Sequence, residues 1–172
     1  MQWLLETQEA DPLQASHDGM TPLHAAAQAG RLECSQYLVK ASKKRPSRIK
    51  DGDGATPVHF AAVKGHSDVL AFFLGEAAAT GDERDEIGAT PVHDAAEQGQ
   101  LAALKVLLYH GATVDLMDSD NLTPRQLAME NGHDECGAFL QAVRGGAGIS
   151  AEQGLAVLAV VGSAFRLMSR CL

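Results

Sequence analysis

The sequence predicts an all-α solenoid in which short helix-turn-helix units stack side by side and are joined by turn or hairpin loops. Two repeating features predict this class. A threonine-proline dipeptide recurs at intervals of 35, 34 and 33 residues, and a glycine falls nine residues after each of these threonines. A unit of this length cannot bury its apolar face alone, so several copies must stack to form one continuous core.

The third copy, residues 90–114, shows how one unit is built. Thr90 is suited to cap a helix whose first position is Pro91, where the missing N–H costs nothing. Gly99 is suited to end that helix, and the apolar run from Leu101 begins a second, bulkier helix that ends near Gly111. Each repeat is therefore predicted to form a pair of short antiparallel helices.

The tetrapeptide at the head of each unit identifies a family. It reads TPLH in the first repeat, TPVH in the second and third, and TPRQ in the fourth. This period with a T-P-L-H-x-A head is typical of ankyrin repeats, and the chain is identified as an ankyrin-repeat protein. Each histidine is expected to tether a loop by hydrogen bonds near the start of its helix. The structural motif residues are Thr21, Pro22, His24, Thr56, Pro57, His59, Thr90, Pro91 and His93.

Taken in order, the chain divides into a half repeat, four repeats and a tail. Residues 1–16 carry an apolar Trp3–Leu5 segment that resembles the end of a second helix whose first helix is missing. We therefore expect a piece of a longer array, with a product of alternative initiation as the other interpretation. The four repeats over 17–144 are expected at 17–50, 51–84, 85–117 and 118–144. Residues 145–172 are expected to form a Gly-rich linker and an apolar tail helix, interpreted as packed on the last repeat or as a poorly ordered tail. The alternative is an interfacial membrane helix.

The first two repeats are expected to differ mainly in their loops. Repeat one should form helices over Pro22–Ala29 and Leu32–Val39. The loop Lys40–Lys50 holds six of the 14 cationic residues and is interpreted as exposed; the alternatives are contact with an acidic partner or phosphorylation at Ser47. Repeat two should bury Phe72, Phe73 and Leu74 in the core.

The later connections carry a different charge pattern. The acidic stretch 81–88 lacks the spacing of a calcium loop and is interpreted as a solvated turn.

In repeat four, Arg125 and Gln126 replace the apolar residue and the histidine of the motif. Polar substitution of this kind is what the last unit of an array needs, so repeat four is predicted to be a C-terminal cap.

Composition restricts the function classes. The formal charge of −8 and the pI of about 5.2 argue against nucleic acid as a partner. Three cysteines at no metal or disulfide spacing favour a reducing compartment, so a cytoplasmic location is expected. The N-terminal segment lacks the features of a signal peptide, and no apolar run reaches the roughly 18 residues of a membrane-spanning helix.

The sequence contains no recognisable catalytic or metal-binding motif. The recurring histidines would lie about 10 Å apart on neighbouring repeats, whereas zinc ligands must all lie about 2 Å from one ion. The sequence has no nucleophile elbow, phosphate-binding loop or zinc-protease motif. We therefore expect no enzyme activity, no metal site and no cofactor.

The remaining candidate is a binding surface. In this architecture the first helices and the turns before them line a concave groove, and the residues between fixed motif positions are free to vary. The mixture of apolar side chains and carboxylates there predicts an extended or helical peptide partner with apolar anchors and some positive charge. The groove candidates are Met20, Gln28, Phe60, Lys64, Asp94, Glu97, Gln98 and Glu130, with Ala25 and Asn131 extending the row.

Several segments are more specific than a generic repeat. Residues 10–30, 51–70, 88–101 and 131–136 resemble the ankyrin region of the espin and espin-like proteins. The resemblance implies a role at actin filament bundles of microvilli and stereocilia, with the array binding tail segments of class III myosins. The family's Pro-rich and actin-binding modules are absent, so contact with actin is expected to be indirect.

The first functional prediction is therefore an espin-like, cytoplasmic and cytoskeleton-associated interaction module, acting as a monomer. The alternative is a generic ankyrin adaptor or inhibitor with an unrelated partner. A third hypothesis is a membrane-associated protein that uses its tail.

Overall fold

The computed structural model describes residues 13–42, 48–77 and 79–145. The predicted half repeat and tail lie almost entirely outside these residues. No described residue lies in a β-strand, so the predicted all-α class is confirmed. The described helices are α2 (Pro22–Gln28), α3 (Leu32–Ala41), α4 (Pro57–Lys64), α5 (Ser67–Gly75), α6 (Pro91–Glu97), α7 (Leu101–Tyr109), α8 (Pro124–Glu130) and α9 (Asp134–Arg144).

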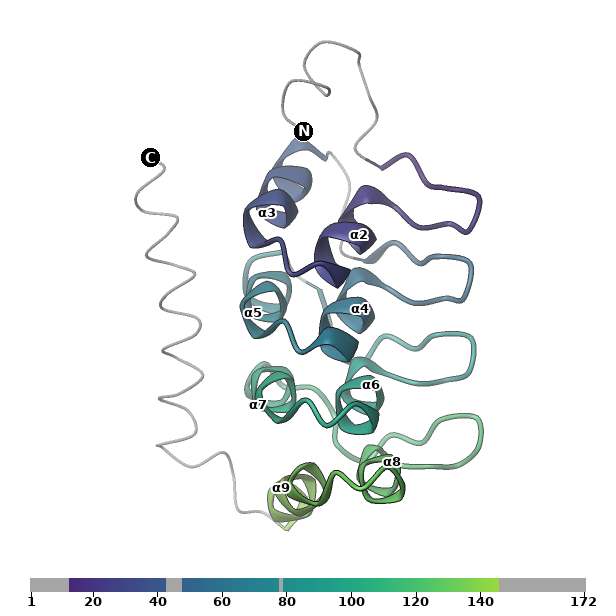
Figure 1. The fold of residues 1–172 in the computed structure, drawn as a ribbon, viewed down its shortest axis with the longest axis vertical. Coiled ribbons are helices and arrows are strands. Elements are labelled where there is room, and N and C mark those ends of the chain that lie inside the picture. Colours follow the sequence, from purple (N-terminus) through teal and green to yellow (C-terminus); the bar gives the residue numbers. More distant parts are fainter. Residues whose placement is uncertain (1–12, 43–47, 78, 146–172) are drawn as a thin grey trace.

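The helices form two parallel rows (Figure 1). The short helices α2, α4, α6 and α8 make the inner row, and α3, α5, α7 and α9 make the outer row. Each inner helix packs on the inner helix of the next repeat as well as on its own outer partner. Extended loops project from the inner row to one side, at the right of Figure 1, and precede each inner helix.

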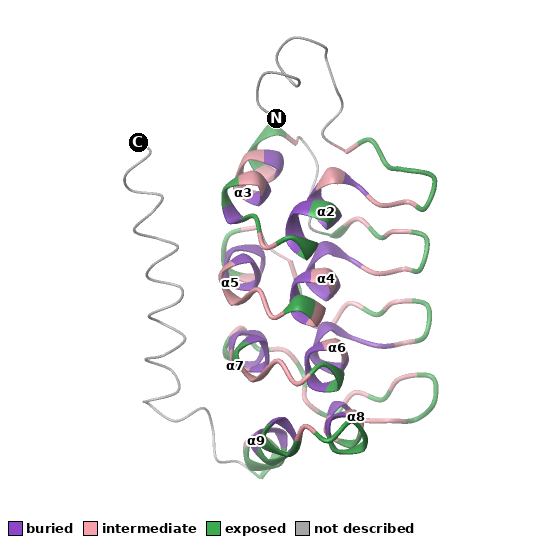
Figure 2. Ribbon diagram, in the orientation of Figure 1, coloured by how far each residue is buried: buried purple, intermediate pink, exposed green. Residues whose placement is uncertain are grey.

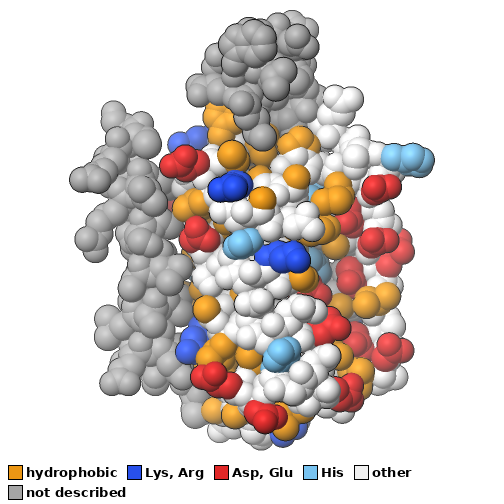
Figure 3. All heavy atoms as spheres, viewed as in Figure 1, with side chains coloured by type: hydrophobic (Ala, Val, Ile, Leu, Met, Phe, Trp, Pro, Cys, Tyr) orange, Lys and Arg blue, Asp and Glu red, His pale blue; other side chains and the backbone are white. Residues whose placement is uncertain are grey.

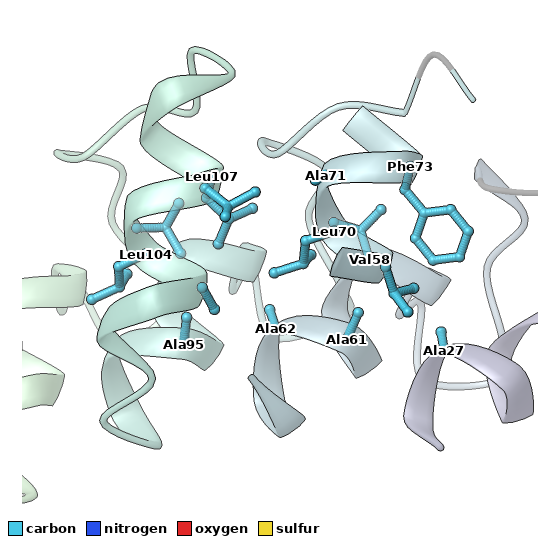
Figure 4. Packing of buried hydrophobic residues seen from close by; sticks show 14 of the residues in the cluster. Ala27, Val58, Ala61, Ala62, Leu70, Ala71, Phe73, Ala95, Leu104 and Leu107 are labelled. Atoms are coloured by element: carbon cyan, nitrogen blue, oxygen red, sulfur yellow. The ribbon is translucent and has the colours of Figure 1, made fainter. Parts of the chain in front are cut away.

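The core lies between the two rows and runs the length of the array (Figures 2 and 4). Inner helices contribute small side chains such as Ala61 and Ala62, while outer helices contribute bulky ones such as Leu70 and Phe73, all fully buried. Small residues on one row let the bulky residues of the other approach closely. Of the three residues expected in the core of repeat two, Phe72 and Phe73 are buried, whereas Leu74 is half-buried and packs against the edge of the core. Burial of each large apolar side chain contributes about 1.5–3 kcal/mol.

The threonine-histidine pair starts each of the first three inner helices. In α6 the backbone N–H of Thr90 donates to Nδ1 of His93 at 3.1 Å, and the Thr90 Oγ1 lies 2.9 Å from the same nitrogen. The other ring nitrogen, Nε2, donates to the carbonyl of Leu122 in the next repeat at 3.2 Å. One imidazole therefore caps its own helix and ties two repeats together.

Repeat four makes the same cap with a different side chain. The Oε1 of Gln126 accepts from the Thr123 N–H at 2.9 Å and from Thr123 Oγ1 at 2.8 Å. The amide therefore replaces the imidazole at the helix start.

The loops before the inner helices are bonded to one another along the array. The backbone N–H groups of Gly52, Glu86 and Ser119 donate to carbonyls of the preceding loop, at 2.8, 3.0 and 2.9 Å. Within the second loop, Asp51 Oδ1 accepts two backbone N–H groups. These bonds satisfy backbone groups that would otherwise be unpaired and hold the loops in a row.

A second contact between repeats forms at the turn inside each helix pair. The imidazole of His66 lies over Gly30, and its Nε2 donates to the carbonyl of Gln28 at 3.1 Å. Gln100 occupies the same place over Gly65. The side chain after each turn glycine thus packs on the turn glycine of the preceding repeat, which leaves no room there for a Cβ.

Two predicted details are corrected. The first inner helix ends at Gln28 rather than Ala29, because Ala29 already serves as the C-cap. The outer helix of repeat one continues past Val39 to Ala41, because the N–H of Ser42 still bonds to the carbonyl of Leu38.

The acidic connection 81–88 is more than a solvated turn. Asp82 accepts from the N–H of Thr113 at 2.7 Å and from its hydroxyl at 2.8 Å. Glu83 forms an ion pair with Arg48 at 2.7 Å, so the basic loop of repeat one contacts this stretch. Both carboxylates have neighbours across repeats that a single repeat's sequence does not reveal.

No described helix has the length and apolar character that crossing a membrane requires. No three or more His, Cys, Asp or Glu side chains in this part of the chain gather closely enough to hold a metal ion.

Candidate functional site

The exposed side of the inner helices repeats with the array. The positions four, seven and eight residues after each repeat's threonine leave side chains partly or fully exposed, while the two alanine positions between them are buried in the first three repeats. We call these twelve residues the inner-helix face. They are Ala25, Gln28 and Ala29; Phe60, Val63 and Lys64; Asp94, Glu97 and Gln98; and Leu127, Glu130 and Asn131.

The predicted contact residues all lie on this face, apart from Met20. Gln28, Lys64, Glu97, Gln98 and Glu130 are exposed. These five side chains make no described hydrogen bond or ion pair, so a partner can contact them without breaking one. Met20, just before the first motif, is half-buried.

Phe60 is the aromatic residue of the inner-helix face. Its ring is half-buried and stands edge-on to the ring of His24, with centroids 5.5 Å apart and an interplanar angle of 82°. Edge-on aromatic pairs of this kind are favourable and hold the ring in one orientation. Because His24 is itself buried and bonded, Phe60 forms a rigid apolar surface over repeats one and two.

Asp94 is the unusual residue of the face. It is half-buried, and its carboxylate makes no hydrogen bond or ion pair within the described part of the chain. Burial raises the pKa of this carboxyl well above its usual value, and the nearby carboxylates of Asp85 and Glu97 raise it further. A negative charge at this position is destabilised by its surroundings, and an incoming cation would relieve that destabilisation.

The surface beside this face is acidic. Figure 3 shows carboxylates gathered over the loops at the right of the view. Each loop contributes an exposed carboxylate, from Asp18, Asp53, Glu86 and Asp120 in turn. Exposed charges of one sign along a face attract a partner of the opposite sign and increase the rate of association.

The motif histidines are not part of the face. His24, His59 and His93 are buried, and burial lowers the pKa of each, with the carbonyl that accepts from Nε2 acting in the opposite direction. The Nε2 atom must carry the proton because it faces a carbonyl, and Nδ1 must be bare because it faces an N–H. These neutral side chains hold the fold together.

Sequence reasoning missed three residues of the inner-helix face, Ala29, Val63 and Leu127. The third of these, Leu127, belongs to the same row as two predicted contact residues. It lies four residues after Thr123, in the same register as Phe60 and Asp94, and is half-buried. Its position four residues after the threonine of the repeat was sufficient to identify it from the sequence. The polar residues Arg125 and Gln126 beside it favoured an interpretation of repeat four as a cap and not as part of the binding face.

A separate cavity of about 320 Å³ lies at the end of the array, between α8, α9 and the loop before them. None of the predicted contact residues lines it. The Nε of Arg125 is buried near it without a hydrogen-bond partner among the described residues, and Arg144 pairs with Asp115 at 3.4 Å. The lining residues are Val114, Asp115, Met117, Thr123, Arg125, Gln126, Leu140 and Arg144.

Comparison with known proteins gives a family match over most of the chain. The profile described as "Ankyrin repeats (3 copies)" matches residues 1–85 and 72–152. Together these matches extend over far more than half of the sequence.

Individual relatives share the repeats but are much longer. The target of rapamycin complex 2 subunit AVO2 of Saccharomyces cerevisiae is 31% identical over 70% of this chain and 28% of its own length. The ankyrin repeat protein nuc-2 of Neurospora crassa is 33% identical over 66% of this chain and 10% of its own. Synphilin-1 of Mus musculus is 28% identical over 72% and 13%. The chain thus spans between a tenth and somewhat over a quarter of these relatives.

Proposed function

The chain belongs to the ankyrin-repeat family, and we propose that it binds a partly basic peptide segment of a partner protein along the inner-helix face. Ankyrin repeats are protein–protein interaction modules, which supports a protein as the partner. The role proposed is binding, not catalysis. We propose further that the chain acts as a monomer in the cytoplasm.

The observation that carries this proposal is the environment of Asp94, whose carboxylate is half-buried and has no bonding partner in the described part of the chain. A half-buried carboxylate with no counter-ion beside two further carboxylates lowers the stability of the fold. Nothing in the described part of the chain compensates for it. A lysine or arginine of a partner would form a charge-assisted hydrogen bond there, typically about 1.5–3 kcal/mol.

The first candidate partner is the tail of a class III myosin. The resemblance of residues 10–30, 51–70, 88–101 and 131–136 to the espin ankyrin region supports it. In this version of the proposal the chain is associated with actin filament bundles through its partner and does not itself contact actin.

The second candidate function is a generic adaptor with an unrelated partner. The relatives described above carry different names, and one of them is named as a subunit of a complex. An ankyrin array within a larger assembly supports an adaptor role without defining the bound segment. The inner-helix face would serve in either case.

Calorimetry with a class III myosin tail fragment tests the proposal and separates the two candidates. An unrelated basic peptide of equal charge is the control ligand. The myosin fragment should bind at least tenfold more tightly, a difference of about 1.4 kcal/mol. Raising the salt concentration from roughly 0.05 to 0.5 M should weaken binding, mainly through slower association.

Matched variants locate the binding face. Asp94→Lys should weaken binding strongly, whereas Glu33→Lys, at an exposed carboxylate on the outer helix α3, should have a small effect. Phe60→Ala should cost about 1–2 kcal/mol of binding free energy, and Tyr109→Ala, an exposed aromatic residue on α7, should cost little. Asp82 is not a suitable control because its carboxylate holds Thr113.

The outcomes are distinct. Equal affinity for both ligands would reject the myosin assignment and favour the adaptor. Loss of binding in Tyr109→Ala but not in Phe60→Ala would reject the inner-helix face.

A further inference from the structure

We propose that the inner-helix face selects a seven-residue pattern in its partner: an apolar side chain, two unrestricted residues, a lysine or arginine, two unrestricted residues, and a second apolar side chain. This inference rests on the proposed function and specifies its ligand. The three residues that select the pattern are Phe60, Asp94 and Leu127.

The spacing of the pattern comes from the register of the array. The three selecting residues each lie four residues after their repeat's threonine, on the successive helices α4, α6 and α8, which pack on one another in that order. Neighbouring packed helices lie about 8–10 Å apart. A peptide in the extended polyproline II conformation advances about 3.1 Å per residue and has three residues per turn, so every third side chain lies on the same side and meets the next repeat.

The chemistry of the pattern comes from the three side chains. Phe60 and Leu127 are half-buried apolar residues that offer contact to an apolar side chain. Asp94 lies between them in the row and has no counter-ion of its own in the described part of the chain. The order apolar, cationic, apolar follows directly from the order of these residues along the array.

An extended partner fits this row better than a helical one. All three selecting residues are half-buried between exposed neighbours such as Lys64 and Glu97, so only side chains that project from a slender backbone reach them. A helix with its side chains is about 10–12 Å wide, as wide as an inner helix of seven or eight residues is long. A helical partner would also need anchors about six or seven residues apart, since its rise is about 1.5 Å per residue.

The pattern reads the same in both chain directions. The test therefore does not depend on which end of the peptide lies at repeat two. It also distinguishes this inference from simple charge attraction, because moving the cation within the peptide leaves the net charge unchanged.

Fluorescence anisotropy with labelled synthetic peptides tests the pattern on the full chain. The reference peptide has leucine at positions one and seven, lysine at position four, and serine or glycine elsewhere. One isomer moves the lysine to position five. A second peptide keeps the same three anchors but places them seven residues apart, as a helical ligand requires.

The reference peptide should bind about tenfold more tightly than either alternative. Asp94→Asn should remove that preference for lysine at position four and weaken the reference peptide by about tenfold. The variant should remain folded, since it removes a destabilised charge. Glu33→Gln, which removes an exposed carboxylate on the outer helix α3, should leave both affinities unchanged.

Two outcomes overturn the pattern in different ways. If all three peptides bind equally and Phe60→Ala weakens all of them, the proposed function stands and the pattern is wrong. If none binds to the folded chain, both the pattern and a basic peptide as the ligand are wrong. Tighter binding of the widely spaced peptide would replace the extended ligand with a helical one.

Discussion

Replacing His93 with alanine removes the side chain that caps α6 and ties repeat three to repeat four. The lost bonds are those from Thr90 N–H to Nδ1, at 3.1 Å, and from Nε2 to the Leu122 carbonyl, at 3.2 Å. Thr90 is fully buried, so its N–H is left unpaired at a cost of about 1–3 kcal/mol. Loss of the buried ring leaves a cavity as well, and the total destabilisation should be about 3–5 kcal/mol.

The chain itself provides the matched control. In repeat four Gln126 accepts the same two bonds from Thr123 that a histidine accepts elsewhere. His93→Gln should therefore preserve the cap, lose only the bond to Leu122, and cost about 1–2 kcal/mol.

Equilibrium unfolding in urea measures both variants at neutral pH. The account predicts an intermediate stability for His93→Gln, between wild type and His93→Ala. Equal destabilisation by the two substitutions would show that the cap contributes nothing, and a loss below 1 kcal/mol in His93→Ala would refute the role of the ring altogether.

The remaining predictions concern pH, a turn and a loop. Because burial lowers the pKa of the three motif histidines, the unfolded chain binds more protons at these residues than the native one below about pH 6.5, so their contribution to the free energy of unfolding should fall as the pH drops from 6.5 through the native pKa values. Asp94 acts in the opposite direction because its native pKa is raised, so urea midpoints at pH 7.5 and 5.5 are compared in the Asp94→Asn variant, where the midpoint should be lower at pH 5.5. An unchanged midpoint would contradict this. Gly99→Ala places a Cβ 2.5 Å from the His133 ring and should lower the melting temperature more than Gly132→Ala, where φ is similarly positive (76° against 67°) and no atom lies within 4 Å of the added Cβ. Equal losses would mean that backbone strain alone determines the effect. Asp82→Ala removes the hydrogen bonds to Thr113 and should lower the free energy of unfolding by about 1 kcal/mol. Peptide affinity measured by calorimetry should not change, and a drop in affinity would place this loop in the binding surface.

The fold could be predicted from the sequence because its determinants lie close together in the chain. The Thr90–His93 pair and Gly99 belong to one repeat, and their spacing recurs often enough to define the helix pair. The contact of His133 with Gly99 could not be predicted in the same way. It joins two repeats, and its form depends on how the units stack, which the spacing within one repeat does not specify.

The candidate face could be predicted in part. The register placed Phe60 and Asp94 on one side of the inner helices, where the structure also places them. The destabilised charge of Asp94 could not be predicted, because it depends on Asp85 in a loop nine residues away and on the packing around both. Leu127 was missed although the same register identifies it.

Mapping a bound ligand by NMR tests the central claim most directly, because it finds the binding surface whatever the natural partner is. The chain is labelled with ¹⁵N and titrated with the reference peptide that carries leucine, lysine and leucine at positions one, four and seven. The account predicts that the largest amide shifts lie on α4, α6 and α8, with those nearest Asp94 changing most. Shifts concentrated on α5 and α7, or around the end cavity near Arg125, would contradict it.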